Sequence, residues 1–165
     1  MPLHDLVIRP VEEGDLDRLQ EVRKTAFAPI FESFRSLLGD RIFAVTQARA
    51  DEEQAAHLES LCRAGSGWEL YVAELPSGIV GFVAVRLDPA TSVGEIGLNA
   101  VHPDAAGQGI GTSMYEFAKA RMRESELTVA TVSTGGDPSH AAARRAYEKA
   151  GFNVGIPSVW LCAQL

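Results

Sequence analysis

The chain has 165 residues, of which 46% are hydrophobic and 22% charged, proportions typical of a globular protein with one sizeable core. This length predicts a single domain over residues 1–165. The formal net charge of -7 argues against a nucleic-acid partner, because nucleic-acid surfaces need clustered lysine and arginine. No apolar stretch approaches the length of a membrane span, so no membrane partner is expected.

The cysteines and histidines predict neither a disulfide framework nor a metal site. Cys62 and Cys162 are far apart and form no Cys-x-x-Cys pair. His4 and His57 lie in segments without a partner ligand, so no metal is expected. The first residues show no basic segment followed by an apolar run, which predicts no signal peptide and a cytoplasmic protein with reduced thiols.

The first half of the chain is predicted to form one strand followed by helices. Residues 6–10 are a short β-rich run closed by proline. Apolar side chains then recur at helical spacing in three runs, 15–28, 30–38 and 51–63. The first run is expected to stop at Pro29 and the second at Gly39.

The second half is predicted to alternate strands with helices. The strands are expected at 68–74, 79–87, 93–101, 127–134 and 156–161, the first two joined as a hairpin and the last at a sheet edge. A helix is expected from 111 to about 125. A second helix is capped by Asp137, has Pro138 at its first position and ends before Gly151. This order predicts a mixed α/β or α+β fold.

A glycine-rich stretch after strand 93–101 is the best candidate for a phosphate site. Gly107, Gly109 and Gly111 remove side chains from a short run, so backbone N–H groups can approach an anion, and the following helix adds its N-terminal dipole. The spacing is not a Rossmann fingerprint, because Thr112 stands where the third glycine belongs. It is not a Walker A loop either, since no lysine precedes Thr112. A plain glycine-rich surface turn is the alternative.

This loop resembles the acyl-CoA loop of the GNAT family, the GCN5-related N-acetyltransferases, whose pattern is Arg/Gln-x-x-Gly-x-Gly/Ala. Gly109 and Gly111 fill the glycine positions, whereas Ala106 replaces the family's arginine or glutamine. Gln108 lies two residues further on.

Residues 139–152 resemble a second GNAT motif, Asn-x-x-Ala-x-x-Leu-Tyr-x-x-x-Gly-Phe. Four positions match in register: Ala143, Tyr147, Gly151 and Phe152. His140 replaces the asparagine and Ala146 the leucine. The whole resemblance covers about residues 68–152.

The resemblance implies a twisted mixed sheet, flanked by helices, in which two parallel strands splay apart and admit acetyl-CoA. The loop would wrap the pyrophosphate, and the end of strand 93–101 would pair with the pantetheine arm. The implied cofactor-binding residues are Leu98, Asn99, Ala100, Val101, Ala106, Gly107, Gln108, Gly109, Ile110, Gly111, Thr112, Ser139, His140 and Tyr147. A surface position for His140, in the capping region of its helix, is the alternative.

Two residues are candidates for the chemistry, since an attacking amine must lose a proton and a leaving thiolate should gain one. Tyr147 resembles the family tyrosine beside the sulfur of coenzyme A; an aromatic ring that packs the helix on the sheet is the alternative. Glu95 is the candidate base, and strand alternation puts it on one face with Gly97 and Asn99. A salt-bridged strand residue and a water chain are its alternatives.

The resemblance therefore implies an acetyl-CoA-dependent N-acetyltransferase that moves the acetyl group directly to a primary amine of a small molecule or peptide. A non-catalytic acyl-CoA-binding regulatory module stays open because of Ala106 and His140, and an O-acyltransferase is a third possibility.

Asp88 and Glu69 could orient a cationic amine. A homodimer could form through the last strand near Trp160. Aromatic side chains could line an acceptor pocket or belong to the core, namely Phe27, Phe31, Phe34, Trp68, Tyr71 and Trp160.

Overall fold

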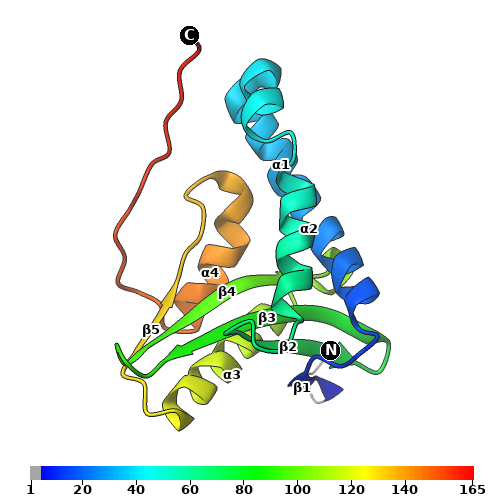
Figure 1. Cartoon of the computed structure of the whole chain (residues 1–165), viewed down its shortest axis with the longest axis vertical. Helices are drawn as coiled ribbons and strands as arrows, with labels where there is room; N and C mark the ends of the chain where they lie inside the picture. The colour runs from blue at the N-terminus through cyan, green and yellow to red at the C-terminus, as the bar shows by residue number, and fades with distance from the viewer. Residues whose placement is uncertain (1–4) are drawn as a thin grey trace.

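The computed structural model describes residues 5–165 and contains a five-stranded mixed sheet with helices on both faces (Figure 1). The sheet follows chain order: β1 (Val7–Pro10), β2 (Glu69–Leu75), β3 (Gly78–Asp88), β4 (Val93–Val101) and β5 (Val129–Val132). Strands β1 to β4 are antiparallel, and β5 runs parallel to β4. The predicted mixed sheet is confirmed. His4 lies outside the described residues, as do the other first residues of the segment that was predicted to contain no signal peptide.

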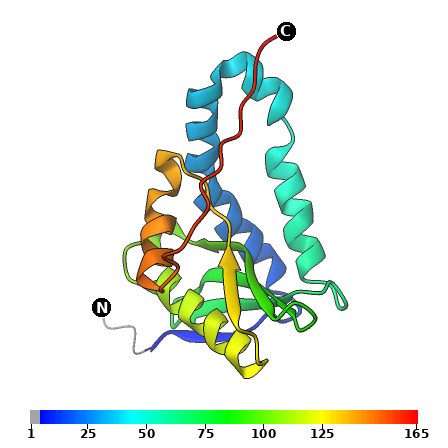
Figure 2. The same cartoon turned by 90° about the vertical axis from the view of Figure 1, so that its left-hand side faces the viewer.

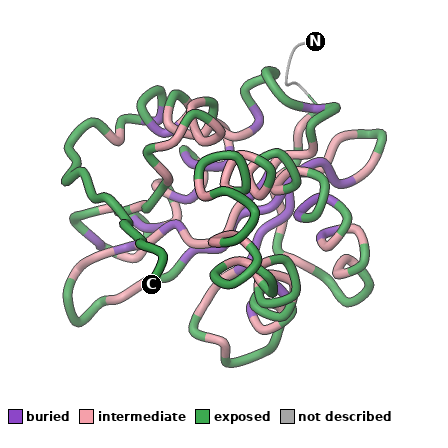
Figure 3. Tube along the Cα trace, turned by 90° about the horizontal axis from the view of Figure 1, so that it is seen from above, coloured by how far each residue is buried: buried purple, intermediate pink, exposed green. Residues whose placement is uncertain are grey.

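Two helices cover each face of the sheet. α1 (Leu16–Thr46) and α2 (Ala50–Leu61) pack on one side around a core that includes Leu19, Leu58 and Phe82. α3 (Ile110–Glu124) and α4 (Ala141–Lys149) lie on the other side, around a core of Val83, Met114 and Tyr147. The buried positions follow the sheet through the centre of the molecule, as Figure 3 shows from above. Short 3-10 turns precede both helices of the second pair: η2 (Pro103–Ala105) and η3 (Pro138–His140).

The prediction that Pro29 ends the first helix is wrong, because α1 continues through it to Thr46. A proline inside a helix removes one backbone donor, and the turns on either side keep their own hydrogen bonds. The predicted break at Gly39 is confirmed. This residue has φ 75° and ψ 157°, a non-helical conformation that glycine adopts readily, and it kinks the long helix.

The predicted ending of α4 is confirmed in atomic detail. Gly151 has φ 91°, its N–H donates to the Glu148 carbonyl over 2.9 Å, and the Phe152 N–H donates to the Tyr147 carbonyl over 3.0 Å. These two bonds are the Schellman arrangement, which satisfies carbonyls that the helix leaves without partners.

The prediction of an edge strand at 156–161 is wrong, because these residues form no strand. Residues 153–165 run as an extended segment outside any strand, past α4 and towards the kinked end of α1 (Figures 1 and 2). The β-forming composition of this segment produces no strand, because a strand requires a hydrogen-bonding neighbour and this one has none within the described chain. β5 is also shorter than the predicted strand at 127–134.

Candidate functional site

The parallel strands β4 and β5 separate halfway along β4. Their pairing runs from Val93 opposite Val129 to Ile96 opposite Val132, whereas β4 continues to Val101. Between the pairs Val83–Asn99 and Val85–Ile96, β3 supplies one residue and β4 supplies two, so β4 carries a bulge. A bulge bends its strand and increases the local twist. The bulge therefore lies where the two strands part.

The bulge also reverses which way the β4 side chains face. Ile96 packs in the core beneath α3 and α4, but Leu98 packs with the core of α1 and α2. Asn99 turns back to the α3 and α4 side, where it contacts two tyrosines. Glu95 pairs with Arg86 and therefore lies on the α1 and α2 side, so it does not share a face with Asn99 as strict alternation predicted.

A cavity of about 780 Å³ occupies the gap between β4 and the loop, α3 and α4. Every predicted site residue lines it except Gln108, which is exposed at the outside of the loop. The opposite wall comes from α1 and α2 and contributes Ala26, Phe27, Ile30 and His57. One cavity thus runs from the glycine loop to the helices of the other layer. His57 was not expected to line the cavity. The sequence offers no signal for it, because its place depends on how α2 packs on the sheet.

The glycine loop lines this cavity with residues that have no side chain. Gly107 and Gly109 have φ of 75° and 86°, left-handed values that other residues adopt at a cost. Gly109 directly precedes α3, and its carbonyl accepts from the Ser113 N–H over 3.0 Å. The amides before Ser113 have no acceptor within the helix, and the first turn carries no acidic side chain. This geometry favours an anion, as the sequence predicted.

Tyr147 meets Asn99 and Tyr115 at the inner end of the cavity. The Asn99 Nδ2 donates to the Tyr147 hydroxyl over 3.0 Å and to the Gly97 carbonyl over 2.9 Å. The Tyr115 hydroxyl donates to the Asn99 Oδ1 over 2.8 Å, and the two tyrosine rings lie 4.4 Å apart. Burial and the neighbouring Tyr147 raise the pKa of Tyr115, which keeps its phenol protonated as a donor.

Tyr115 was not among the predicted site residues. It lies four residues after Gly111 and three before Ala118, so the helical stripe that faces the sheet could have identified it. Asn99 was predicted to contact the cofactor through its backbone, and its side chain hydrogen-bonds the two phenols.

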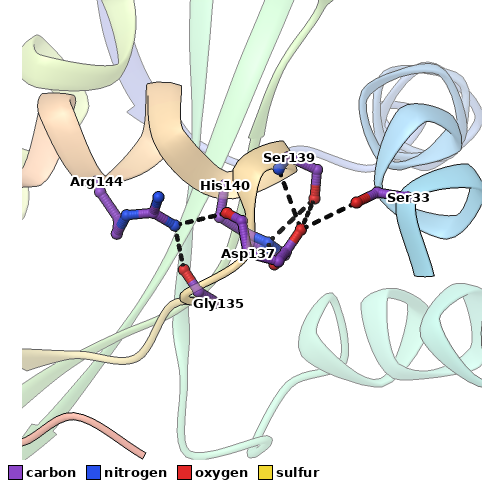
Figure 4. Close-up of polar contacts among 6 residues, drawn as sticks. All are labelled: Ser33, Gly135, Asp137, Ser139, His140 and Arg144. Carbon is purple, nitrogen blue, oxygen red and sulfur yellow. Dashed lines mark hydrogen bonds and ion pairs between the residues drawn. The ribbon is translucent and has the colours of Figure 1, made fainter. Parts of the chain in front are cut away.

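A second polar cluster surrounds Asp137 where the chain enters α4 (Figure 4). The His140 Nδ1 lies 2.5 Å from the Asp137 Oδ1. The Asp137 Oδ2 accepts from the Ser139 hydroxyl and N–H and, over 3.2 Å, from Ser33 of α1. Burial acts to raise the pKa of Asp137, but hydrogen bonds from Ser139 and His140 outweigh it and lower the pKa to about 2. The carboxylate is therefore charged at neutral pH.

This cluster alters the expectations for Ser139 and His140. Asp137 caps the 3-10 turn η3 that leads into α4, whereas the prediction had it cap the helix itself, and the Ser139 hydroxyl is bound to Asp137. His140 is not a surface residue: its side chain is 16% exposed, stacks on Phe34 with ring centroids 6.0 Å apart, and lines the cavity. Gly135 makes room for the pair, since a Cβ there would lie 2.4 Å from the His140 Nδ1.

The sequence profile of the acetyltransferase (GNAT) domain matches residues 66–154. The chain belongs to the GNAT acetyltransferase family. No sequence among the curated proteins matches this GNAT chain.

Solved structures share the fold of this GNAT protein at low sequence identity. A PaiA N-acetyltransferase from Thermoplasma acidophilum in complex with coenzyme A has a TM-score of 0.71 and 17% identity, over 93% of this chain and 92% of that chain. An aminoglycoside acetyltransferase from an uncultured soil metagenomic sample, in complex with sisomicin, has a TM-score of 0.58 and 18% identity, over 98% of this chain and 97% of that chain. A ribosomal-protein-alanine N-acetyltransferase from Brucella melitensis has a TM-score of 0.58 and 20% identity, over 96% of this chain and 99% of that chain.

Glu95 lines the cavity of this GNAT protein while forming an ion pair with Arg86. The Arg86 guanidinium also lies 5.1 Å from the centroid of the Trp68 ring. The structure thus contains the salt bridge that was the alternative for Glu95. The Glu95 side chain is also 35% exposed and lines the cavity.

The other acidic residues considered for an amine are engaged elsewhere. Glu69 binds Arg121 and Tyr71 over 2.8 Å and 2.6 Å, and Asp88 caps its own loop through Thr91. Neither lines the cavity. Of the aromatic candidates, Phe27 alone lines this space.

Within the described part of the chain, no group of three or more His, Cys, Asp or Glu side chains is arranged to hold a metal ion. None of the helices in residues 5–165 has the length and apolar character needed to cross a membrane.

Proposed function

We propose that this protein, acting as one domain over residues 1–165, binds acetyl-CoA in the gap beside β4 and transfers the acetyl group directly to a primary amine of a small molecule or peptide. The observation that carries the proposal is the phenol of Tyr147, held by Asn99 at the inner end of a cavity whose outer end is the glycine loop. A diphosphate on the loop and a thioester near the phenol fit the two ends of one extended cofactor.

The cofactor would be held mainly by backbone groups. Beyond Ile96 the residues Leu98 to Val101 have no β5 partner, so the pantetheine amides can pair with them as an added strand would. The pyrophosphate would accept hydrogen bonds from the loop and the first turn of α3, where Gly107, Gly109 and Gly111 keep the backbone accessible. Thr112 adds a hydroxyl. His140 flanks the cavity with a polar edge in place of the family's asparagine.

Two proton transfers begin and end the reaction. The neutral amine attacks the thioester carbonyl, a carbon–nitrogen bond forms, and the carbon–sulfur bond then breaks with the electron pair leaving on sulfur. Tyr147 would donate its proton to that sulfur. Before the attack, Glu95 would accept the proton that the ammonium group loses, directly or through water, from the α1 and α2 side of the strand.

This division places acceptor and cofactor on opposite faces of β4, which the bulge makes possible. The acceptor wall combines a carboxylate with apolar side chains, Ala26, Phe27 and Ile30, next to His57. A cationic amine attached to an apolar body matches that wall, since the carboxylate attracts the ammonium and the apolar side chains bury the rest. We expect the protein to work in the cytoplasm with both cysteines reduced.

A second candidate is a regulatory module that binds acyl-CoA without transfer. Ala106 lines the cavity with a methyl group where the family has a long polar side chain, and Glu95 is already paired with Arg86. The first feature removes a polar contact to the cofactor, and the second makes the carboxylate less available as a base.

Titration calorimetry with acetyl-CoA, combined with a free-thiol assay over a library of amines and alcohols, separates these functions. Thiol release that depends on an amine supports the N-acetyltransferase. Dependence on an alcohol would indicate O-acetylation, and binding without thiol release would indicate the regulatory module. Absence of acetyl-CoA binding would refute all three.

A further inference from the structure

The nitrogen of the attacking amine must lose a second proton, for which no acceptor has been assigned. Glu95 takes the first proton before the attack, and Tyr147 protonates the leaving sulfur at the end. In between, the neutral amine bonds to the thioester carbonyl and its nitrogen becomes positively charged. The amide is complete only when this nitrogen has lost one more proton. The residue that accepts it has to border both the cofactor and the acceptor.

His140 lies where the cofactor side and the acceptor side of the cavity meet. It is the N-cap residue of α4 and lines the cavity together with Tyr147, which follows two helical turns later on the same face, about 10 Å along the axis. From the acceptor side, Phe34 of α1 stacks on the His140 ring with centroids 6.0 Å apart. Phe34 comes one turn after Ile30, which lines the acceptor wall. His140 therefore borders both substrates.

Asp137 determines which ring nitrogen of His140 can accept a proton (Figure 4). The His140 Nδ1 lies 2.5 Å from the Asp137 Oδ1. The carboxyl of Asp137 has a pKa of about 2, so at neutral pH it is a carboxylate that can only accept hydrogen bonds. Nδ1 therefore carries the ring proton, and Nε2 keeps its lone pair. No group in residues 5–165 is hydrogen-bonded to Nε2, so this lone pair is available.

The Asp137 carboxylate has no competing cation among its described partners. Arg144, the nearest one in the chain, donates to the backbone carbonyls of Gly135 and Asp137 over 2.6 Å and 2.8 Å instead. The negative charge of Asp137 is thus directed at His140. A charge in this position stabilises the imidazolium ion that forms when Nε2 takes up a proton.

We propose that His140 accepts this second proton from the amine, an inference that rests on the acetyl transfer proposed above. The His140 Nε2 takes the proton from the nitrogen of the tetrahedral intermediate, and the nitrogen keeps the electron pair. The oxyanion then re-forms the carbonyl, the carbon–sulfur bond breaks with its electron pair on sulfur, and Tyr147 protonates the sulfur. The imidazolium ion returns its proton through solvent to the Tyr147 oxygen, so both side chains are restored. Asp137 acts through His140 as a positioning residue.

The contacts of the second Asp137 oxygen predict what an amide would do in its place. Oδ2 accepts from the Ser139 N–H over 3.1 Å, from the Ser139 hydroxyl and from the Ser33 hydroxyl. Because a backbone N–H can only donate, the amide oxygen of Asp137→Asn has to take the Oδ2 position, which leaves its NH2 group facing His140. The NH2 group would donate to Nδ1, so the ring proton would move to Nε2 and the lone pair would be lost.

The first experiment replaces the imidazole of His140 by free imidazole. His140→Ala should lower kcat for the best amine of the library about 100-fold, a usual contribution of a positioned base. Added imidazole should raise this kcat at least about tenfold, and a more basic methylimidazole should raise it further, because the added base takes the proton in place of the side chain. The same assay without amine corrects for direct attack of imidazole on acetyl-CoA.

His102→Ala is the matched control. The His102 side chain is 14% exposed against 16% for His140, and its Nδ1 lies 3.7 Å from the Asp104 Oδ2, so it too is a largely buried histidine beside an aspartate. It does not line the cavity. This variant should keep kcat within about threefold of wild type, and imidazole should leave its kcat unchanged. Thermal melting followed by circular dichroism checks that each variant is folded.

The second experiment determines the tautomer of His140 without any turnover. Long-range proton–nitrogen correlation spectra of the nitrogen-15-labelled protein separate protonated from unprotonated ring nitrogens, and His140→Ala assigns the signals. Neutral His140 should carry its proton on Nδ1 in the wild type and on Nε2 in Asp137→Asn. The Asp137→Asn protein should lose about as much kcat as His140→Ala. Imidazole should not restore it, because the His140 ring still occupies its place.

Three results would overturn the assignment of His140. The first is a His140→Ala protein with kcat within about threefold of wild type. The second is a folded His140→Ala protein with low kcat that neither imidazole restores, which would make His140 a packing partner of Phe34. The third is a wild-type His140 with its proton on Nε2. In all three cases amine-dependent thiol release by the wild type still supports the proposed function. A wild type that releases no thiol with any amine would instead refute the acetyl transfer and this assignment together.

Discussion

Replacing Tyr147 by phenylalanine removes one hydroxyl from the inner end of the cavity and leaves the ring in place. The ring is 6% exposed and packs against Tyr115 and Phe152, contacts that do not need the oxygen. The change therefore isolates the proton that Tyr147 is proposed to give to the leaving sulfur. We expect kcat to fall by roughly 10²- to 10³-fold, the usual contribution of a positioned acid, with the affinity for acetyl-CoA almost unchanged.

The effect on stability should be small by comparison. Asn99 loses the acceptor at 3.0 Å but still donates to the Gly97 carbonyl and still accepts from Tyr115. One lost hydrogen bond costs about 1 kcal/mol, which corresponds to about 2–4 °C in Tm for a protein of this size. A large loss of activity with a shift this small would not be due to unfolding.

The assay is steady-state release of coenzyme A with the amine found in the library screen, together with calorimetric titration of acetyl-CoA. Tyr71→Phe is the matched control: it removes a phenol that is bound to Glu69 over 2.6 Å and does not line the cavity. It should lower Tm to a similar extent and leave kcat unchanged. A Tyr147→Phe protein with kcat within about threefold of wild type would refute the role of the phenol.

Three further predictions concern the loop, the base and the Asp137 cluster. Gly109→Val should weaken acetyl-CoA binding at least about tenfold by calorimetry, because φ of 86° costs a β-branched residue about 1–2 kcal/mol or more; unchanged affinity would argue against the loop as the diphosphate site. Glu95→Gln should remove the acidic limb of the kcat/KM–pH profile; an unaltered profile would exclude Glu95 as the base. The pKa of Asp137 is lowered from 3.8 to about 2, so its contribution to stability is complete above about pH 4 and is lost as the pH falls towards 2. In Asp137→Asn, urea denaturation between pH 5 and 2 should lack this part of the acid sensitivity, and a wild-type slope would contradict the assignment.

Local patterns in the sequence determined most of the elements and several of their ends. The glycine loop before α3, the cap of Asp137 and the glycine that ends α4 depend on backbone conformation over a few residues, which the residue types specify directly. The hairpin strands and β4 follow from runs of apolar and β-branched side chains. The two spaced motifs were then sufficient to identify the family.

The tertiary structure decided what depends on distant neighbours. The bulge in β4 arises from pairing with β3, and it put Glu95 and Asn99 on opposite faces although alternation had placed them together. His57 and the stacking of His140 on Phe34 depend on how helices of one layer meet the other. The last strand was predicted from composition, yet a strand also needs a hydrogen-bonding partner, and none of the described residues provides one for residues 156–161.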